Sequence, residues 1–411
     1  MSLFGQEMRK IWRPGILAAL VVLGGLYYTL RLSFFVEQID GGRWRWDEHA
    51  AEYQLRRELM EQYGPVLDFA DLPSLERRLE EEKARFEELV RDVPEAVEAG
   101  LSTYDALYAI WDGDIEAVNR LTAPGVTLTL EEGFEILNAV RPNTNYSEVY
   151  ALDYFLSRAS IYTDDVFSLS ESPHFEDDPP WVRSRLAELE EQRGLGINLL
   201  SEHFPRYFTL EYIKFAAVWV VLSVILLLSP TLVRDRLRRT RAMQWASCRG
   251  RRVLEVQMAA GLASSLLATA VNIVVLAVPL AVKGAGSFWD CPLFTCEGSP
   301  FPWYDWTYGQ YLLVMAGMLL VLGLITGALT LFLSQYSANY VPMMLKAVPL
   351  FVMVGMLFGY TLMEDMFCFS RTNGLFSSAP PAFEVPVFAA VLALGLGLCA
   401  WTCSRQRRRE L

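Results

Sequence analysis

Five long stretches of this chain contain no charged residue, and this feature restricts its fold more than any other. A helix needs about 20 apolar residues to cross a hydrocarbon core about 30 Å thick. One stretch is about twice that length and is interrupted by the polar segment SQYSANY, residues 334–340, so it holds two helices. The sequence therefore predicts six membrane-spanning helices, at about 14–35, 212–232, 254–282, 310–333, 342–363 and 384–404.

The first predicted span, residues 14–36, follows a short basic segment, as the apolar core of a signal peptide does. The residues that come next, TLRLSFFVEQ, offer no small-residue cleavage site. We therefore expect this span to remain in the chain as a signal-anchor, and residues 210–411 to carry the other five spans.

The distribution of lysine and arginine predicts the orientation of the spans, because these residues concentrate in cytoplasmic loops. Basic residues precede the first span, fill the loop 233–253 and follow the sixth span. With six spans these segments share one side, so we expect both termini in the cytoplasm and a multi-pass membrane protein. Eight arginines are expected to hold the loop against anionic lipid: Arg234, Arg236, Arg238, Arg239, Arg241, Arg249, Arg251 and Arg252.

Residues 37–209 form a large acidic segment on the predicted outer side. Residues 37–208 carry a net charge of −21 and the rest of the chain +9, which together give the whole-chain value of −12. A segment of this length can bury its own core, and its apolar residues recur at helical spacing. We expect a mainly helical extracellular domain, with helices at 47–63, 73–93, 103–111, 114–121, 130–140, 147–160 and 180–193. The fold class is then an all-α polytopic membrane protein with this domain inserted between helices one and two.

Cysteines and small or polar residues give weaker signals. Cys291 and Cys296 lie in a predicted outer loop, where they can form a disulfide, stay as thiols, or pair with Cys368. Asn272 is the notable polar residue inside a span, and we interpret it as a partner in an interhelical hydrogen bond. The G-x-x-x-G pairs at 323/327 and 355/359 allow close helix packing, either within the chain or in a dimer.

Enzymatic motifs are missing from the sequence. It has no metalloprotease helix motif, no G-x-S-x-G elbow and no phosphate-binding G-x-x-x-x-G-K-[ST] loop. We predict a protein that is not an enzyme, with no metal site and no cofactor of its own. The basic loop joins two membrane spans, so a topology signal explains it better than nucleic-acid binding, and we expect no nucleic-acid partner.

The first 13 residues, MSLFGQEMRKIWR, are predicted to form an amphipathic cytoplasmic helix on the membrane surface. Ile11 and Trp12 belong to its apolar side and Lys10 to its polar positions. Together with Glu7 and Pro14 these residues give an E-x-x-K-I-x-x-P opening. The opening, the stretches EQYGPVLDFADLPSLERRLEEEK and AGLSTYDAL, and the six-span layout resemble the permease subunits of ABC-type (type-2-like) exporters with a helical ectodomain.

The loop after the second span strengthens the resemblance. Asp235, the segment 243–246 and the Gly250-Arg251 pair stand at places that match the family. A lysine is often expected just inside the third span, where this chain has Glu255, Val256 and Gln257.

The resemblance implies a subunit that exports a hydrophobic or amphiphilic molecule, such as a drug, a lipid or a peptide. It also implies a second permease subunit, identical or different, and a separate cytosolic ATPase that carries the ATP and magnesium. The surface helix, with Glu7, Lys10, Ile11 and Trp12, and the coupling loop would transmit ATP-driven motion to the spans. The predicted coupling residues are Met243, Gln244, Trp245 and Ala246.

A second hypothesis is a membrane sensor or immunity protein. In that case the acidic domain binds cationic peptides without transport, because a net charge of −21 attracts cations.

Overall fold

The computed structural model describes residues 2–39, 47–123, 125–163, 180–193, 196–201, 204, 209–237, 253–294, 303–364, 366–368 and 379–410. The chain forms two compact units. Met1–Gln38 and Glu202–Leu411 make up the first unit, which we call the helical bundle. Ile39–Ser201 make up the second, the inserted domain.

Six helices in the described part of the chain are long and apolar enough to cross a membrane, which confirms the predicted number of spans. This composition fits a multi-pass membrane protein. The elements that form the six spans are α2 (Pro14–Tyr27) with η1 (Tyr28–Leu32) and α3 (Ser33–Gln38), α12 (Glu211–Leu237), α14 (Val253–Val282), α15 (Tyr308–Gln335), α16 (Tyr340–Phe351) with η10 (Val352–Thr361), and α17 (Glu384–Glu410).

Local sequence signals set several helix ends in the bundle. Pro14 opens α2, where its missing N–H costs nothing. Thr307 and Gln310 form a capping box at the start of α15. The Asn339 side chain accepts a hydrogen bond from the Val341 N–H at 3.0 Å and caps α16. The predicted turn between the fourth and fifth spans therefore has a helix cap at its end.

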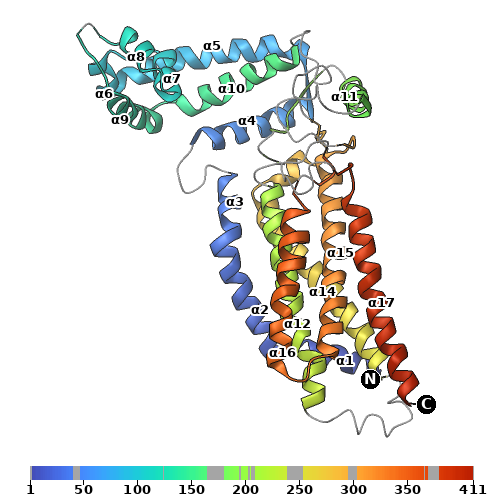
Figure 1. Ribbon diagram of the computed structural model, residues 1–411. Coiled ribbons are helices and arrows are strands. Elements are labelled where there is room, and N and C mark those ends of the chain that lie inside the picture. The colour runs from blue at the N-terminus through green and yellow to red at the C-terminus, as the bar shows by residue number, and fades with distance from the viewer. Residues whose placement is uncertain are drawn as a thin grey trace. The chain divides into compact units, whose positions relative to one another are not determined.

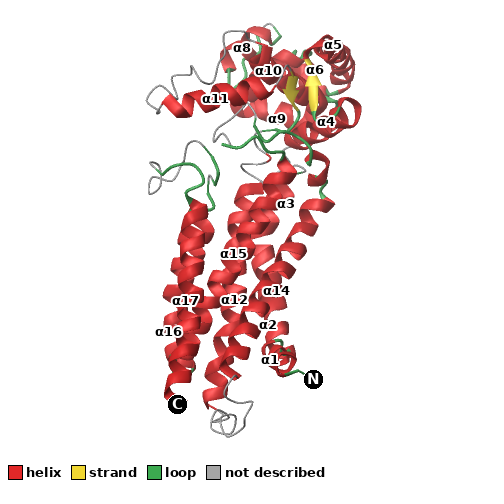
Figure 2. Cartoon of the chain, turned by 90° about the vertical axis from the view of Figure 1, so that its right-hand side faces the viewer, coloured by secondary structure: helices red, strands yellow, loops and turns green. Residues whose placement is uncertain are grey.

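α12 is the central helix of the bundle and α2 lies at its edge. Of the most apolar window in each helix, 83% is buried in α12 but only 6% in α2. Figure 2 shows α12, α14 and α15 running side by side along the bundle. A further short helix, α1 (Leu3–Ile11), lies across one end of the bundle, where α12 and α17 also end (Figure 1).

The G-x-x-x-G glycines pack inside the chain. A Cβ atom added at Gly327 of α15 would lie 2.4 Å from Ser265 Oγ of α14. One added at Gly359 of η10 would lie 3.4 Å from Ala217 Cβ of α12. The sequence was compatible with close helix packing either within the chain or in a dimer. In the structure both glycine pairs pack against other helices of the same chain.

The inserted domain is mainly helical, and it also contains two short strands that the sequence did not predict. β1 pairs antiparallel with β2, with Val66 opposite Asn198, and so ties the start of the domain to its end (Figure 2). Three-residue strands are too short to show an alternating pattern. The elements are α4 (Asp47–Tyr63), β1 (Val66–Asp68), η2 (Phe69–Asp71), α5 (Leu72–Leu89), η3 (Val90–Asp92), α6 (Pro94–Ala99), α7 (Tyr104–Asp112), α8 (Ile115–Leu121), α9 (Leu130–Val140), η4 (Arg141–Asn143), α10 (Tyr146–Thr163), α11 (Pro180–Arg193) and β2 (Gly196–Asn198).

Candidate functional site

The N-terminal helix α1 is docked on protein through one face. Ile11 is 1% exposed and belongs to the same apolar cluster as Leu232 of α12 and Leu254 of α14. Trp12 Nε1 donates a hydrogen bond to Ser264 Oγ of α14 at 3.1 Å. The sequence predicted a helix that lies on the membrane surface, but it did not predict that Ile11 enters the core of the bundle.

A polar junction holds the same helix to the ends of α12 and α14. We define it as Glu7, Lys10, Asp235 and Gln257. Glu7, 3% exposed, forms an ion pair with Lys10 at 2.5 Å. Gln257 Nε2 donates to Asp235 Oδ2 at 2.8 Å and lies 3.4 Å from Glu7 Oε2. Lys10 Nζ also lies 4.0 Å from Asp235 Oδ2. One amide and one ammonium thus connect two carboxylates on different helices.

A further arginine reaches the same junction. Arg234 Nη2 donates to the backbone oxygen of Lys10 at 3.0 Å, so among the described residues Arg234 and Lys10 meet Glu7 and Asp235 at the end of the bundle. Buried charges are tolerated when they are paired and hydrogen-bonded. Removal of any one member deletes a contact that holds α1 to the ends of α12 and α14, so the junction favours a single position of α1.

The junction lies at the two ends of the basic loop. Asp235 is two residues from the end of α12, and Gln257 is in the second turn of α14. The predicted coupling residues Met243, Gln244, Trp245 and Ala246 lie outside the described residues. So do the predicted anchoring arginines Arg238, Arg239, Arg241, Arg249, Arg251 and Arg252. The roles of both groups stay predictions.

Arg236, another predicted anchoring arginine, has protein partners. Its guanidinium donates to the backbone oxygens of Ser337, at 2.5 Å, and of Gln335. These carbonyls lie at the end of α15, where a cation is favoured by the helix dipole. In the C-terminal helix α17, Arg407 pairs with Glu255 of α14. The predicted attraction of Arg234 and Arg236 to lipid is untested by these contacts.

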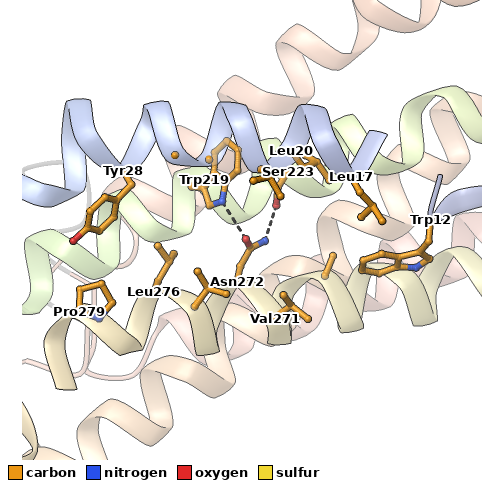
Figure 3. Close-up of a pocket in the computed structure, with 15 residues that line it drawn as sticks. Trp12, Leu17, Leu20, Tyr28, Trp219, Ser223, Val271, Asn272, Leu276 and Pro279 are labelled. Carbon is orange, nitrogen blue, oxygen red and sulfur yellow. Dashed lines mark hydrogen bonds between the residues drawn. The ribbon is translucent and has the colours of Figure 1, made fainter. Parts of the chain in front are cut away.

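Asn272 connects α14 to α12 and lines a pocket. Its Oδ1 accepts a hydrogen bond from Trp219 Nε1 at 3.1 Å, and its Nδ2 donates to Ser223 Oγ at 2.9 Å (Figure 3). The pocket lies between α2, α12 and α14 and has a volume of about 480 Å³. Trp12 lies near one end of the pocket and Tyr28 near the other (Figure 3).

An ion-pair cluster that the sequence did not predict lies at the start of α12, at the other end of this helix from the polar junction. Lys214 is 1% exposed, and its Nζ lies 2.5 Å from Glu211 Oε1 and 2.9 Å from Glu364 Oε1. The same ammonium lies 4.6 Å from the centre of the Tyr360 ring. The separation of 150 residues between Lys214 and Glu364 leaves no local pattern that could have revealed this pair.

The predicted pairing of Cys291 with Cys296 is not tested. Cys291 is buried, whereas Cys296 lies outside the described residues, so its pairing stays a prediction. Cys399 and Cys403 are free thiols, and Cys399 donates to the backbone oxygen of Ala328. Across the described ranges no group of three or more His, Cys, Asp or Glu side chains could hold a metal ion.

The inserted domain carries an aromatic ladder, which we define as Tyr104, Tyr108, Tyr150 and Tyr154 of α7 and α10. Successive ring centres lie 5.9, 6.2 and 6.1 Å apart. Burial raises the pKa of Tyr150 to about 12. Lys83 Nζ lies 5.2 Å from the centre of the Tyr104 ring, so the ladder already accepts a cation from within the domain.

Comparison of the chain with protein family models, with curated proteins and with solved structures finds no match.

Proposed function

We propose that this chain is the membrane-spanning permease subunit of an ATP-binding-cassette exporter, located in a bacterial plasma membrane. It would pair with a second permease subunit and take its energy from a separate ATPase on the cytoplasmic side. The six apolar helices support this proposal. So does the gathering of α1, the end of α12 and the end of α17 at one end of the bundle (Figure 1).

The observation that carries the proposal is the polar junction. It ties α1 to Asp235 and Gln257, which flank the loop where an ATPase would dock. Only Trp12 and Arg13 separate α1 from α2. A displacement of the loop would therefore move the ends of α2, α12 and α14 together. Such a rigid coupling of three spans is what an exporter driven from outside its own chain requires.

The test is co-expression of the chain with candidate ABC-type ATPases from the same genome, followed by purification of the complex and measurement of ATP hydrolysis and export in vesicles. We expect a stable complex. Gln257→Leu removes the amide that links both carboxylates, so export should fall about tenfold or more while the complex still assembles. Arg9→Gln, at an exposed position of α1, is the matched control and should leave export unchanged. Absence of any bound ATPase in all detergents and lipids would refute the proposal.

A second candidate function, binding of cationic peptides by the inserted domain, is favoured by the surroundings of the aromatic ladder. Tyr108 is 37% exposed, and burial together with the nearby carboxylates Asp112 and Asp153 raises its pKa. An aromatic face next to carboxylates suits arginine and lysine side chains. Binding of oligoarginine to the full chain without any effect of ATP, and its loss in Tyr108→Ala, would favour this function over export.

A further inference from the structure

The pocket beside α2 opens at the outer surface of the helical bundle. Val21 of α2 is 74% exposed, and Val271 and Val275 of α14 are 47% and 59% exposed, although all three line the pocket. These helices are long and apolar enough to cross a membrane. A ligand would therefore enter this pocket sideways from the hydrocarbon phase.

The lining of the pocket excludes an ionic ligand. None of the described residues that line it is charged, and most are Leu, Val, Ala, Gly, Pro or Trp. An ion transferred into such a site would lose its hydration and find no counter-charge, which is strongly unfavourable. The occupant must be uncharged and mostly apolar.

Asn272 places an amide between the two ends of these walls, and the hydroxyl group of Tyr28 lies near one end. A side-chain amide offers two lone pairs and two N–H groups. The hydrogen bonds with Trp219 and Ser223 use one of each. One acceptor and one donor position of the amide thus stay available to a ligand. In a hydrocarbon environment this favours a ligand that carries a hydrogen-bonding group of its own.

The depth of this amide limits the choice of ligand further. Asn272 stands three residues from position 269, the midpoint of the uncharged stretch 256–282 of this span. At about 1.5 Å per residue the amide lies about 4.5 Å from the middle of a span centred in a hydrocarbon core about 30 Å thick. The polar groups of a phospholipid lie at the membrane surface and do not reach this depth.

We propose that this pocket binds an uncharged, elongated apolar molecule with one hydrogen-bonding group near its middle, such as a carbonyl or a hydroxyl. The apolar ends lie along α2 toward Trp12 and toward Tyr28, and the central polar group contacts Asn272 (Figure 3). The binding site belongs to this chain alone, so the inference stands independently of the proposed transport function.

Two glycines of α2 provide a matched pair of variants. An added Cβ at Gly25, which lines the pocket, meets no atom within 4 Å, so Gly25→Phe adds a ring at the wall of the pocket without a clash of its Cβ atom. Gly15 lies on the same helix, also meets no atom within 4 Å and does not line the pocket. Gly15→Phe therefore controls for the added ring itself.

The experiment uses the purified full chain in lipid nanodiscs and methyl 12-doxylstearate as the probe. This ester is uncharged and carries a hydrogen-bond-accepting nitroxide along its chain. Electron paramagnetic resonance measures the motionally restricted fraction of the probe. We expect a saturable restricted fraction in the natural chain and in Gly15→Phe, displaced by unlabelled methyl 12-hydroxystearate. Gly25→Phe should lower the affinity at least tenfold, and Asn272→Leu about fivefold, the value of one hydrogen bond.

A phosphatidylcholine with the nitroxide at the same position of its acyl chain is the second probe. It should show no restricted fraction that depends on Gly25. The proposal is overturned if the ester shows no saturable restricted fraction in the natural chain. It is also overturned if Gly25→Phe and Gly15→Phe bind the ester equally, or if the phospholipid competes as well as the hydroxyester does.

Discussion

Gly323→Ala tests the close approach of α14 and α15. A Cβ atom added at Gly323 would lie 2.0 Å from Thr269 Oγ1 and 2.9 Å from Thr269 Cβ. Rotation of the threonine would relieve only the first contact. It would also break the hydrogen bond from Thr269 Oγ1 to the Ser265 backbone oxygen at 2.9 Å, which is worth about 1 kcal/mol. The second contact remains, so the helices must also move apart.

Overpacking of this kind costs about 1–3 kcal/mol. Alanine is also a better helix former than glycine by about 1 kcal/mol, which partly offsets the cost. Gly317→Ala is the matched control, because Gly317 lies on the same helix and an added Cβ there meets no atom within 4 Å. The two variants share the gain in helix propensity, so their free energies of unfolding should differ by the overpacking cost alone.

The assay is the apparent melting temperature of the purified chain in detergent micelles. A difference of about 1–3 kcal/mol corresponds to roughly 2–12 °C, with Gly323→Ala the less stable variant. If both alanine variants melt at the same temperature, the contact between α14 and α15 at this position is looser than the structure shows and the reasoning is refuted.

Two further predictions concern charged groups. Burial raises the pKa of Asp153 in the folded domain, so folding favours its protonated form: the stability this gives is present at low pH and is lost as pH rises through the raised pKa. The melting temperature of Asp153→Asn should therefore rise relative to that of the natural chain as the pH increases from 4 to 7. A difference in melting temperature that does not change with pH would contradict this. Lys214→Met leaves Glu211 and Glu364 facing each other and should lower stability by about 1–3 kcal/mol. Adding Glu364→Gln should restore part of this loss in the same melting assay, and no recovery would argue against the pairing.

Local patterns were sufficient to predict most of the secondary structure. Long uncharged stretches predicted six apolar helices, and the bounds of α4, α9 and α11 agree with the expected ones. The short helix α6 was missed because six residues contain too few turns for a periodic pattern. Patterns of this kind depend only on residues within one helix, so the sequence shows them without information on which helices pack together.

The sequence by itself determined which segments are apolar, where most of the helices lie and how charge divides between the two parts of the chain. It did not fix every helix end, since α12 and α17 continue beyond the predicted positions 232 and 404 to Leu237 and Glu410. It also placed Glu7 and Lys10 on an N-terminal helix and Asn272 inside a span. Only the tertiary structure decided that Glu7 meets Gln257, 250 residues away, and that Asn272 faces a pocket. The physical reason is that helix formation depends on residues a few positions apart, whereas a polar junction forms only where packing brings distant side chains together.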